Sequence, residues 1–505
     1  MSSLYNSRRD FLKAMGLGAA SLAFTGCEHA SEPFGRGASG KRPNILFCLA
    51  DDWSWPHASI AGDKVVKTPT FDRVARQGVL FENAFVSSPS CTPSRGAILT
   101  GQWHWRLEEG ANLWSTLQVK FAVYPDLLEE AGYHIGYTRK GWAPGRDAPG
   151  GRTRNPAGPR YKNFEEFMKA RPEGTPFCFW FGSGDPHRGY KWQSGVKSGI
   201  KLEDVEVPAC FPDSEEVRTD ICDYYWEVQR FDTEVGGLLK MLEGTGELDN
   251  TLIVISGDNG LPFPRCKSNL YDTGTNVPLA VRCPSFVKGG RVVEDFISLT
   301  DLAPTFLEAA GLKPTAQMTA KSFLDILTFG KSGWVDARRD HVLTGKERHV
   351  VCQETGTGGY PMRAIRTHDF LYIRNFKPER WPAGAPKGYS QPIDINVARP
   401  RGTHYGYGDV DAAPTKSYML KYRDDPKVKR LFELGFGKRP SEELYDLKKD
   451  PDQLNNVAGQ PGYARVKKKL ADALMAELKA TKDPRVLGKG DAFDNYPYYG
   501  SLPKK

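Results

Sequence analysis

The sequence lacks the patterns that mark several large classes of protein. Its 505 residues contain no Cys-x-x-Cys pair and no cysteine–histidine spacing of the zinc-binding kind. They contain no basic and aromatic module for nucleic acid, no internal repeat and no low-complexity segment. We therefore expect a globular chain without structural zinc and with no nucleic acid among its partners.

The composition provides enough apolar residues for a large core. Apolar residues make up 39% of the chain, and this length predicts two domains, one of them large. Lys and Arg (69) exceed Asp and Glu (61), which fits either an ordinary basic protein or an enzyme that meets anionic substrates. Of the nine cysteines, Cys48 and Cys178 lie in apolar runs and are expected in the core, while Cys210 could pair with Cys222.

The N-terminus has the features of an export leader. Residues 1–27 carry the pair Arg8 and Arg9, then a short apolar stretch that ends in LAFTGC. The paired arginines resemble a twin-arginine signal, and LAFTGC resembles a lipobox in which Cys27 is lipidated. We expect export by the twin-arginine machinery to the bacterial periplasm, with residues 28–42 as a tether to the membrane. A plain cleaved leader is the alternative.

Four apolar runs end in polar residues: NILFCLADDW, YHIGYTRKG, PFCFWFGSGDPHRG and TLIVISGDNG. Such runs fit buried parallel strands, and helical patterns such as TPTFDRVARQG lie between them. The alternation predicts an α/β domain with a mostly parallel sheet, in which ligand sites lie beyond the carboxyl ends of the strands. One pocket would then gather the residues that follow these runs, which are Asp51, Asp52, Lys140, Asp185, His187, Asp258 and Asn259.

Two of these strand ends supply only oxygen ligands. Asp51 and Asp52 follow one run, and Asp258 and Asn259 follow another. Hard oxygen donors without histidine suit Ca²⁺ or Mg²⁺. Asp and Asn are also common helix N-caps and turn residues, but two such pairs at equivalent positions favour a metal.

The stretch SSPSCTPSRGAILTGQ (residues 87–102) predicts an anion pocket. Pro93 suits the first turn of a helix, so Cys91 would lie at its start, where free backbone N–H groups favour anions. Arg95 adds a fixed positive charge one turn into the helix. A thiolate nucleophile is possible in principle, but the cysteine–arginine spacing is shorter than in thiolate phosphatases.

The motif Cys-x-Pro-Ser-Arg-x-x-x-x-Thr-Gly resembles the signature of the formylglycine sulfatases. It is matched by Cys91, Pro93, Ser94, Arg95, Thr100 and Gly101. The stretches ADD, GDNG, KSNLYDTGTNVPLAVRCP and ELYDLKKDPDQLNNVA follow in the family order, so the resemblance runs from about residue 43 to 480. DNGLPFPRCKSNLY, DPHRG and GYPMRAIRTHDFLYIRNF resemble the heparan N-sulfatase (sulfamidase) subfamily. An alkaline-phosphatase-like fold is implied.

The resemblance also implies roles for the site residues. A formylglycine-generating enzyme would convert Cys91 to formylglycine, whose hydrate attacks sulfur. Arg95, Lys140 and Lys267 would offset charge on the sulfuryl oxygens, and His187 would protonate the leaving group. The metal ligands for Ca²⁺ or Mg²⁺ would be Asp51, Asp52, the residue at position 91, Asp258 and Asn259.

The implied substrate is a sulfated glycan, cleaved at a chain end. N-sulfoglucosamine is the first candidate, and an O-sulfated sugar is the alternative. Arg188 and Arg363 are candidates for substrate binding, with structural ion pairs as the equal alternative.

One residue departs from the family pattern, because Trp142 stands where the family has a histidine. A decayed sulfatase, acting as a glycan-binding lipoprotein, would explain this departure. A phosphoesterase of the same superfold is a further rival, although such enzymes usually carry Ser or Thr with histidine metal ligands.

We expect a catalytic domain at residues 43–345 and a C-terminal α+β subdomain at 346–505. HVVCQETG (349–356) and YPMRAIRTHDFLYIRNF alternate like antiparallel strands, and YARVKKKLADALMAELKAT reads as an amphipathic helix. Residues 376–415, rich in Pro and Gly, predict a long loop that walls the pocket.

Overall fold

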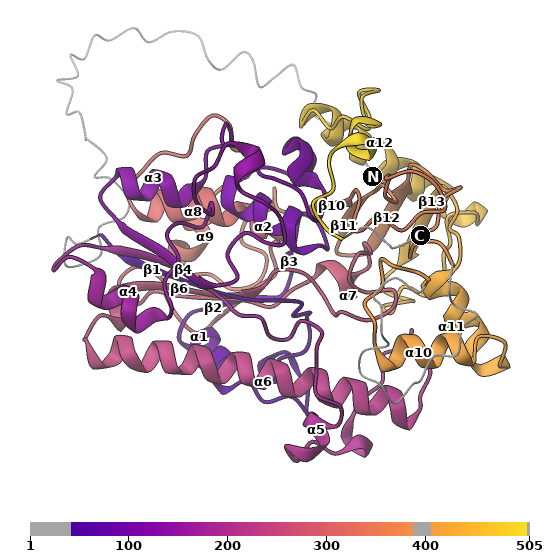
Figure 1. The fold of residues 1–505 in the computed structure, drawn as a ribbon, viewed down its shortest axis with the longest axis horizontal. Helices are drawn as coiled ribbons and strands as arrows, with labels where there is room; N and C mark the ends of the chain where they lie inside the picture. The colour runs from indigo at the N-terminus through magenta and orange to yellow at the C-terminus, as the bar shows by residue number, and fades with distance from the viewer. Residues whose placement is uncertain (1–41, 387–405, 502–505) are drawn as a thin grey trace, which may run out of the picture. The chain divides into compact units, whose positions relative to one another are not determined.

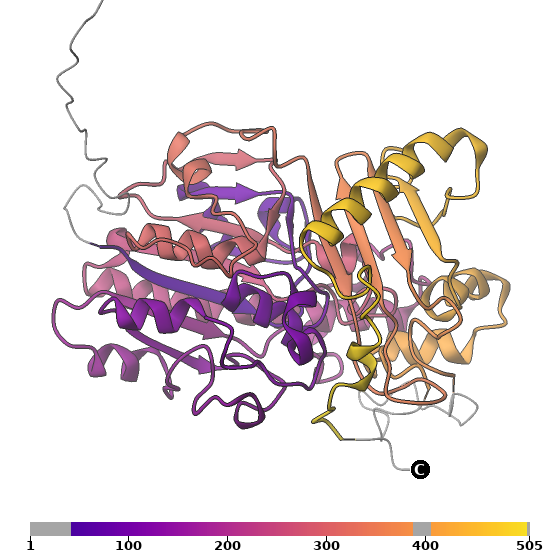
Figure 2. The ribbon, with the colours of Figure 1, turned by 90° about the horizontal axis from the view of Figure 1, so that it is seen from above.

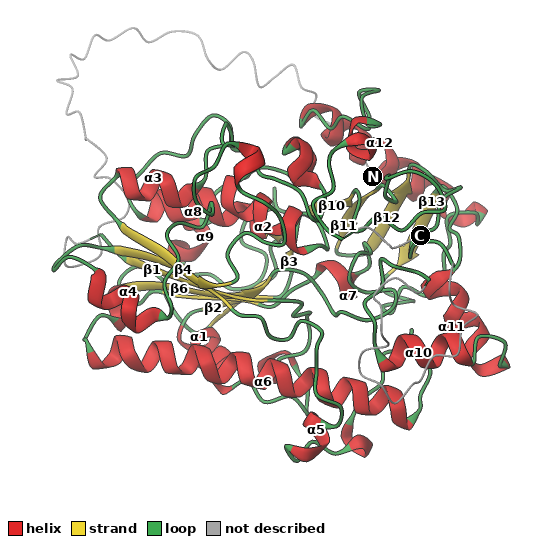
Figure 3. Cartoon of the chain, in the orientation of Figure 1, coloured by secondary structure: helices red, strands yellow, loops and turns green. Residues whose placement is uncertain are grey.

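The computed structural model describes residues 42–386 and 406–501, which belong to one compact unit. The leader and nearly all of the tether expected at residues 1–42 lie outside this range. Within it, no helix is both long and apolar enough to cross a membrane. Figure 3 shows helices on both sides of a central sheet, with a second sheet beside it.

The central sheet has seven strands in the order β4-β5-β1-β6-β7-β2-β8. Only β7 runs against its neighbours, so the sheet is mostly parallel, as expected. Its strands are β1 (Asn44–Ala50), β2 (Val79–Phe81), β4 (His134–Arg139), β5 (Phe177–Gly182), β6 (Thr251–Gly257), β7 (Leu279–Arg282) and β8 (Arg291–Val293). A small parallel pair joins β3 (Ala84–Phe85) to β9 (Ile297–Ser298).

Helices cover both faces of this sheet, because β1 is apolar on both sides. Leu46 and Cys48 pack in the same core cluster as the inner faces of α1, α4 and α6, whereas Phe47 and Leu49 pack with α2, α3, α8 and α9. Figure 1 shows α6 and α3 on opposite sides of the strands. The bounds are α1 (Pro69–Gln77), α2 (Cys91–Thr100), α3 (Tyr124–Glu130), α4 (Phe164–Ala170), α6 (Glu215–Gly244), α8 (Leu302–Ala309) and α9 (Leu324–Phe329).

The second sheet is antiparallel, as expected for the C-terminal part. It comprises β10 (His341–Lys346), β11 (Met362–Thr367), β12 (Phe370–Asn375) and β13 (Glu442–Asp446). The expected boundary after residue 345 therefore falls inside β10. Helix α12 (Ala464–Ala480) lies across this sheet in Figure 2 and buries Leu470, Leu474 and Leu478. The remaining helices are α5 (Ser194–Lys197), α7 (Asp272–Thr275), α10 (Pro414–Lys421), α11 (Pro426–Phe436) and α13 (Ala492–Asn495).

Three local expectations differ from the structure. Residues 349–356 form no strand, because their backbone and side chains bind other loops: Val350 N–H donates to Asp409 at 3.0 Å. The expected 376–415 loop ends at Pro414, where α10 begins, and its residues 387–405 lie outside the described range. Cys210 and Cys222 are both free thiols. Cys48 and Cys178 are buried in the core, as expected.

Candidate active site

The polar residues that follow four parallel strands meet at one end of the sheet. Lys140, after β4, places Nζ 2.5 Å from a carboxylate oxygen of Asp51, after β1. His187 Nε2, after β5, lies 3.9 Å from Asp52. The Asp52 backbone N–H donates to Asp258, after β6, at 3.0 Å. The expected convergence is therefore observed, because parallel strands all end at the same edge.

Cys91 is the first residue of α2, and Ser90 is its N-cap. The Cys91 thiol lies 3.4 Å from an Asp51 oxygen and 4.0 Å from Asp52. Every residue of α2 is buried, so this helix is fixed on all sides. Gly101 ends the helix with φ +63°. The Thr-Gly pair of the motif thus supplies the left-handed helix end that glycine adopts without strain.

Two cations lie beside the cysteine, Arg95 on the same helix and Lys267 in the loop after β6. Arg95 Nε donates to Asp258 at 2.7 Å, and its Nη1 donates to the carbonyl oxygens of Lys140 and Gly141. Lys267 Nζ lies 2.7 Å from Asp52. Cys91 is 3% exposed, and Lys267 is 4% exposed. Both cations are therefore buried near the thiol, and each is paired with a carboxylate.

The oxygen donors fit a hard divalent cation. One ligand atom from each of Asp51, Asp52, Cys91 and Asp258 can be chosen so that all lie within 4.8 Å of one another. Asn259 adds an amide oxygen that is buried without a hydrogen-bond partner, which a metal ion would satisfy. None of these residues caps a described helix, so the N-cap alternative does not hold for them. Oxygen-rich donors of this kind suit Ca²⁺ or Mg²⁺.

The charges shift the protonation equilibria in opposite directions. Burial acts to raise the pKa of Asp51, but Lys140, His187 and Arg95 outweigh it and hold that pKa below the usual range. Burial raises the pKa of Asp52 to about 6, because Lys267 and His187 offset it only in part. Burial also raises the pKa of the Cys91 thiol, so the unmodified residue is a poor nucleophile at neutral pH.

A cavity of about 550 Å³ opens onto these residues. Five expected site residues line it: Asp51, Cys91, Lys140, His187 and Lys267. Gly408, Val410 and Asp411 also line it, so the described end of the expected 376–415 loop does form part of its wall. This volume is within the range of ~300 to 1,000 Å³ that is typical of small-molecule sites.

Sequence reasoning missed several residues of the cavity. His349 Nδ1 lies 2.8 Å from the Ser90 hydroxyl, and burial lowers the pKa of His349 to about 4, so its ring is neutral. Asp411 lies 3.2 Å from Lys267 Nζ. Trp114 and Tyr498 also line the cavity. His349, Asp411 and Tyr498 come from loops far from the motif in sequence, and Trp114 lies shortly after it. No local pattern marks any of the four.

Two expected substrate residues do not line the cavity. Arg363 is fully buried, and it donates to Asp483 at 2.6 Å and to Glu347 at 2.7 Å. Arg188 forms a buried two-contact pair with Asp220. The structure therefore favours the ion-pair alternative for both arginines.

Trp142 does not line the cavity either. It is 2% exposed and packs in the core cluster that contains α2 and α3. The Trp142 indole, at a position where the family has a polar residue, is therefore part of the core and not part of the cavity wall.

The fold is alkaline-phosphatase-like, and its site combines candidate ligands for a cation with buried arginine and lysine side chains. The family described as Sulfatase matches residues 43–151 and 159–312, which is more than half of the chain. The chain belongs to the sulfatase family, whose members hydrolyse sulfate esters or sulfamates. Residues 266–379 also match the family described as N-sulphoglucosamine sulphohydrolase, C-terminal.

Individual relatives agree with this assignment. An ulvan-active sulfatase of Formosa agariphila is 28% identical over 84% of this chain and 72% of its own length. Human N-sulphoglucosamine sulphohydrolase is 27% identical over 88% of this chain and 91% of its own length. A solved enzyme in complex with its substrate D-glucosamine-2-N,6-O-disulfate shares the fold with a TM-score of 0.60 and 20% identity, covering 88% and 99% of the two chains.

Proposed function

We propose that this protein removes sulfate from a sulfated glycan, with formylglycine at position 91 and Ca²⁺ or Mg²⁺ as cofactors. The observation that carries the proposal is the position of Cys91, which begins a buried helix and faces carboxylates, lysines and the cavity together. A formylglycine-generating enzyme would make the modification. The hydrated aldehyde supplies an oxygen nucleophile that a protonated thiol cannot, and a second hydroxyl through which sulfate is released.

The cations of the site bind and orient the sulfate group. Lys140 and Lys267 line the cavity beside position 91, and each is paired with only one or two carboxylates. A sulfate placed there would bring its oxygens to these ammonium groups, and Arg95 would hold Asp258 in position behind them.

His187 is the proposed acid for the leaving group. Its Nδ1 lies 3.1 Å from the Arg188 carbonyl oxygen, which can only accept, so this nitrogen carries a proton. The opposite nitrogen, Nε2, lies 3.9 Å from Asp52 at the cavity wall. The protonated ring can therefore give a proton from Nε2 to the departing oxygen or nitrogen.

The metal would be held by Asp51, Asp52, Asp258 and Asn259 with the residue at position 91. When bound, it would polarise the sulfuryl oxygens and the nucleophile. The unpartnered Asn259 oxygen and the clustering of Asp51, Asp52 and Asp258 support this assignment. The proposed ligand set contains no histidine, which disfavours the phosphoesterase rival, whose usual ligand set includes histidines.

The substrate is proposed to be a chain-end sugar. N-sulfoglucosamine is the first candidate because the C-terminal match and the human relative carry that name. An O-sulfated sugar is the second candidate, favoured by the similarity to ulvan-active sulfatases. The cavity wall formed by residues 408 and 410–412 supports exo action.

The proposal is tested by sulfate release from separate probes. Purified wild-type protein and Cys91→Ala should be incubated with N-sulfoglucosamine, with O-sulfated monosaccharides and with long sulfated polymers. Release from N-sulfoglucosamine by the wild type alone is the expected result. Release from only the O-sulfated sugars would select the second candidate, and release from only the polymers would reject exo action. A protein that releases no sulfate would support a binding lipoprotein instead.

We also propose that the chain is exported by the twin-arginine route and tethered through Cys27. Replacing Arg8 and Arg9 by Lys should leave the protein in the cytoplasm, and Cys27→Ser should abolish incorporation of labelled fatty acid. Normal export of the double variant would contradict the route, and unchanged labelling of Cys27→Ser would contradict the tether.

A further inference from the structure

The cavity has two chemically different parts. Its buried part carries Cys91 and Lys267, which are 3% and 4% exposed. Its open part carries Trp114, which is 36% exposed, and the neighbouring Tyr498 and Ser501. The thiol and Lys267 therefore lie at the base of the cavity, and the exposed indole of Trp114 lies near its mouth.

The two aromatic residues come from distant parts of the chain and are held together. The backbone N–H of Tyr499 donates to the Trp114 carbonyl oxygen at 2.8 Å. Gly500 lies against both rings, since a β-carbon there would approach Tyr498 Cζ to 2.6 Å and Trp114 Cγ to 2.9 Å. The segment 496–501 and the loop at 113–114 thus lie side by side where they line the cavity.

Arg348 holds this segment in place. It is 2% exposed, and it donates to the carbonyl oxygens of Tyr496 at 3.0 Å and Pro497 at 2.8 Å. Its guanidinium carbon lies 5.3 Å from the centre of the Tyr498 ring. The next residue along the chain, His349, lines the base of the same cavity. One loop therefore connects the position of Tyr498 to the position of the reacting groups.

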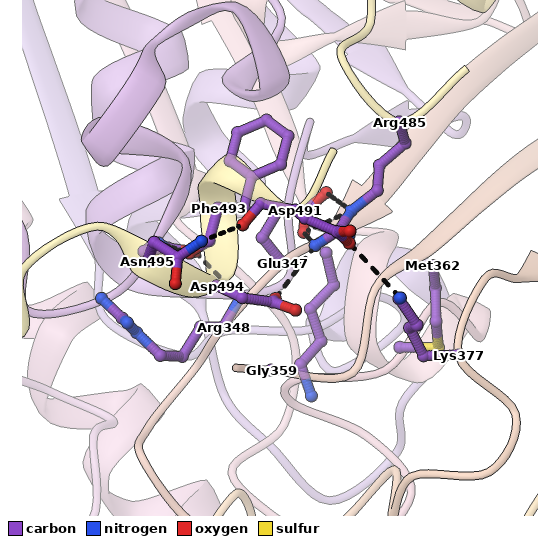
Figure 4. A network of polar contacts seen from close by, with 12 residues as sticks. Glu347, Arg348, Gly359, Met362, Lys377, Arg485, Asp491, Phe493, Asp494 and Asn495 are labelled. Atoms are coloured by element: carbon purple, nitrogen blue, oxygen red, sulfur yellow. Dashed lines mark hydrogen bonds and ion pairs between the residues drawn. The ribbon is translucent and has the colours of Figure 1, made fainter. Parts of the chain in front are cut away.

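Ion pairs fix the tail that leads to Tyr498. Figure 4 shows Arg485 beside Glu347 and Asp494, with contacts of 2.7 Å and 3.2 Å. Asn112, two residues before Trp114, donates from its side chain to the Phe493 carbonyl oxygen at 2.9 Å. The aromatic mouth is therefore preformed before any ligand binds, which lowers the entropic cost of binding.

Trp114 also has an unusual backbone. Its φ is +53°, in the left-handed region that is unfavourable for a bulky residue. Such conformations persist mainly where surrounding contacts impose them, and they cluster at binding sites. This backbone, together with the carbonyl contact to Tyr499, supports a binding role for the exposed indole.

We propose that Trp114 and Tyr498 form a platform for the sugar ring that neighbours the sulfated one. This inference rests on the proposed function. A pyranose ring has a flat face of C–H groups, which packs against an aromatic ring without needing a charged partner. With sulfate held at the base by Lys140 and Lys267, the next ring of the glycan reaches the mouth of the cavity.

Two substrates that differ only in length distinguish the contribution of this platform from that of the reacting groups. We would measure kcat/KM of wild type, Trp114→Ala and Tyr498→Ala on a sulfated monosaccharide and on a tetrasaccharide that ends in the same sugar. Loss of an aromatic contact should lower kcat/KM for the tetrasaccharide about 10-fold for each variant, with less than about 3-fold change for the monosaccharide. Trp114→Phe and Tyr498→Phe should retain most of the rate on both.

Trp334 provides a matched control, because it is 49% exposed and does not line the cavity. Trp334→Ala should leave both rates unchanged. An equal loss on both substrates in Trp114→Ala and Tyr498→Ala would overturn the platform while the proposed function stands. Wild-type protein that releases sulfate from neither substrate, nor from any other sulfated sugar, would overturn both.

Discussion

Two buried arginines of this molecule, Arg95 and Arg363, have similar surroundings but different hydrogen bonding. Each is fully buried and donates from Nε to an aspartate, at 2.7 Å and 2.6 Å respectively. Every guanidinium nitrogen of Arg363 has a partner, from Asp483, Glu347 and two carbonyl oxygens. Nη2 of Arg95 has no hydrogen-bond partner, and it lies 3.7 Å from Asp51.

The difference separates a structural arginine from a functional one. A saturated guanidinium only stabilises the fold, because it has no hydrogen left to offer a ligand. A buried guanidinium N–H group without a partner costs free energy in the folded state. Such a group is expected where a ligand or a metal-bound group completes the site. Residue type and burial alone would not have distinguished the two arginines.

The largest expected effect on activity comes from replacing Cys91, the proposed reacting residue, which lies on the same helix as Arg95. Cys91→Ala should lower kcat/KM for sulfate release by at least ~10⁴-fold, because no nucleophile can form at position 91. The thermal midpoint should change by only a few degrees, since a small buried side chain is lost. Sulfate release and circular dichroism measure the two effects. A rate within 10-fold of the wild type would contradict the assigned nucleophile.

Matched substitutions at the two arginines test the comparison directly. Arg95→Lys should lower kcat by ~10²- to 10³-fold, because a lysine cannot hold Asp258 and the two carbonyl oxygens in the same geometry. Steady-state kinetics on the best sulfated monosaccharide gives the value. A variant that raises KM at unchanged kcat would instead show that Arg95 contributes only to ground-state binding.

The same substitution at Arg363 should act on stability instead. Arg363→Lys should lower the free energy of unfolding by about 2 to 3 kcal/mol, because a lysine cannot make the paired contacts with Asp483 and Glu347. Urea titration measures the loss. The kcat of the folded fraction should match the wild type, and a selective loss of kcat would place Arg363 in the active site after all.

The smallest effect concerns a histidine in the antiparallel sheet. His341 Nε2 lies 2.5 Å from Glu477 on α12, and this pair with Asp340 outweighs burial and raises the pKa of His341 to about 9. A raised pKa stabilises the fold below the unfolded value of ~6.5, and the contribution is lost as pH rises through about 9. His341→Gln should therefore be about 1 to 2 kcal/mol less stable at pH 6.

This difference between wild type and His341→Gln should disappear by about pH 10. Thermal unfolding of both proteins across that range measures it, and Glu477→Gln serves as the matched partner variant. A difference that stays constant with pH would show that the contact is not ionic.

The site residues that could be predicted from the sequence are those that directly follow a strand of the parallel sheet. Asp51, Lys140 and Asp258 each follow a parallel strand, so one rule about strand ends brings them together. His349 and Tyr498 could not be found in this way. His349 follows the second sheet's first strand and contacts Ser90, and Tyr498 lies in the C-terminal tail, where the N–H of the next residue, Tyr499, donates to Trp114. Both contacts join residues that are far apart in the chain.

The incorrect strand at 349–356 has a similar cause. Its alternating pattern fits a strand, but the Val350 backbone N–H and the Cys352 thiol donate to Asp409, which lies in a loop distant in the sequence. Arg363 illustrates a different limit. Its place in β11 was expected, but whether it faced the substrate or Asp483 depended on residues of the C-terminal tail.

The burial of Cys91 has a consequence for the timing of biosynthesis. In the folded protein the thiol is 3% exposed, so the proposed formylglycine-generating enzyme would have to reach it before the site closes. Asn259, which contacts the thiol, lies 168 positions later, and His349 lies 259 positions after Ser90. At a synthesis rate of ~5 to 20 residues per second, these segments emerge on the order of ten seconds or more after position 91. Translation itself would therefore set a minimum interval in which the cysteine is open to the proposed modifying enzyme.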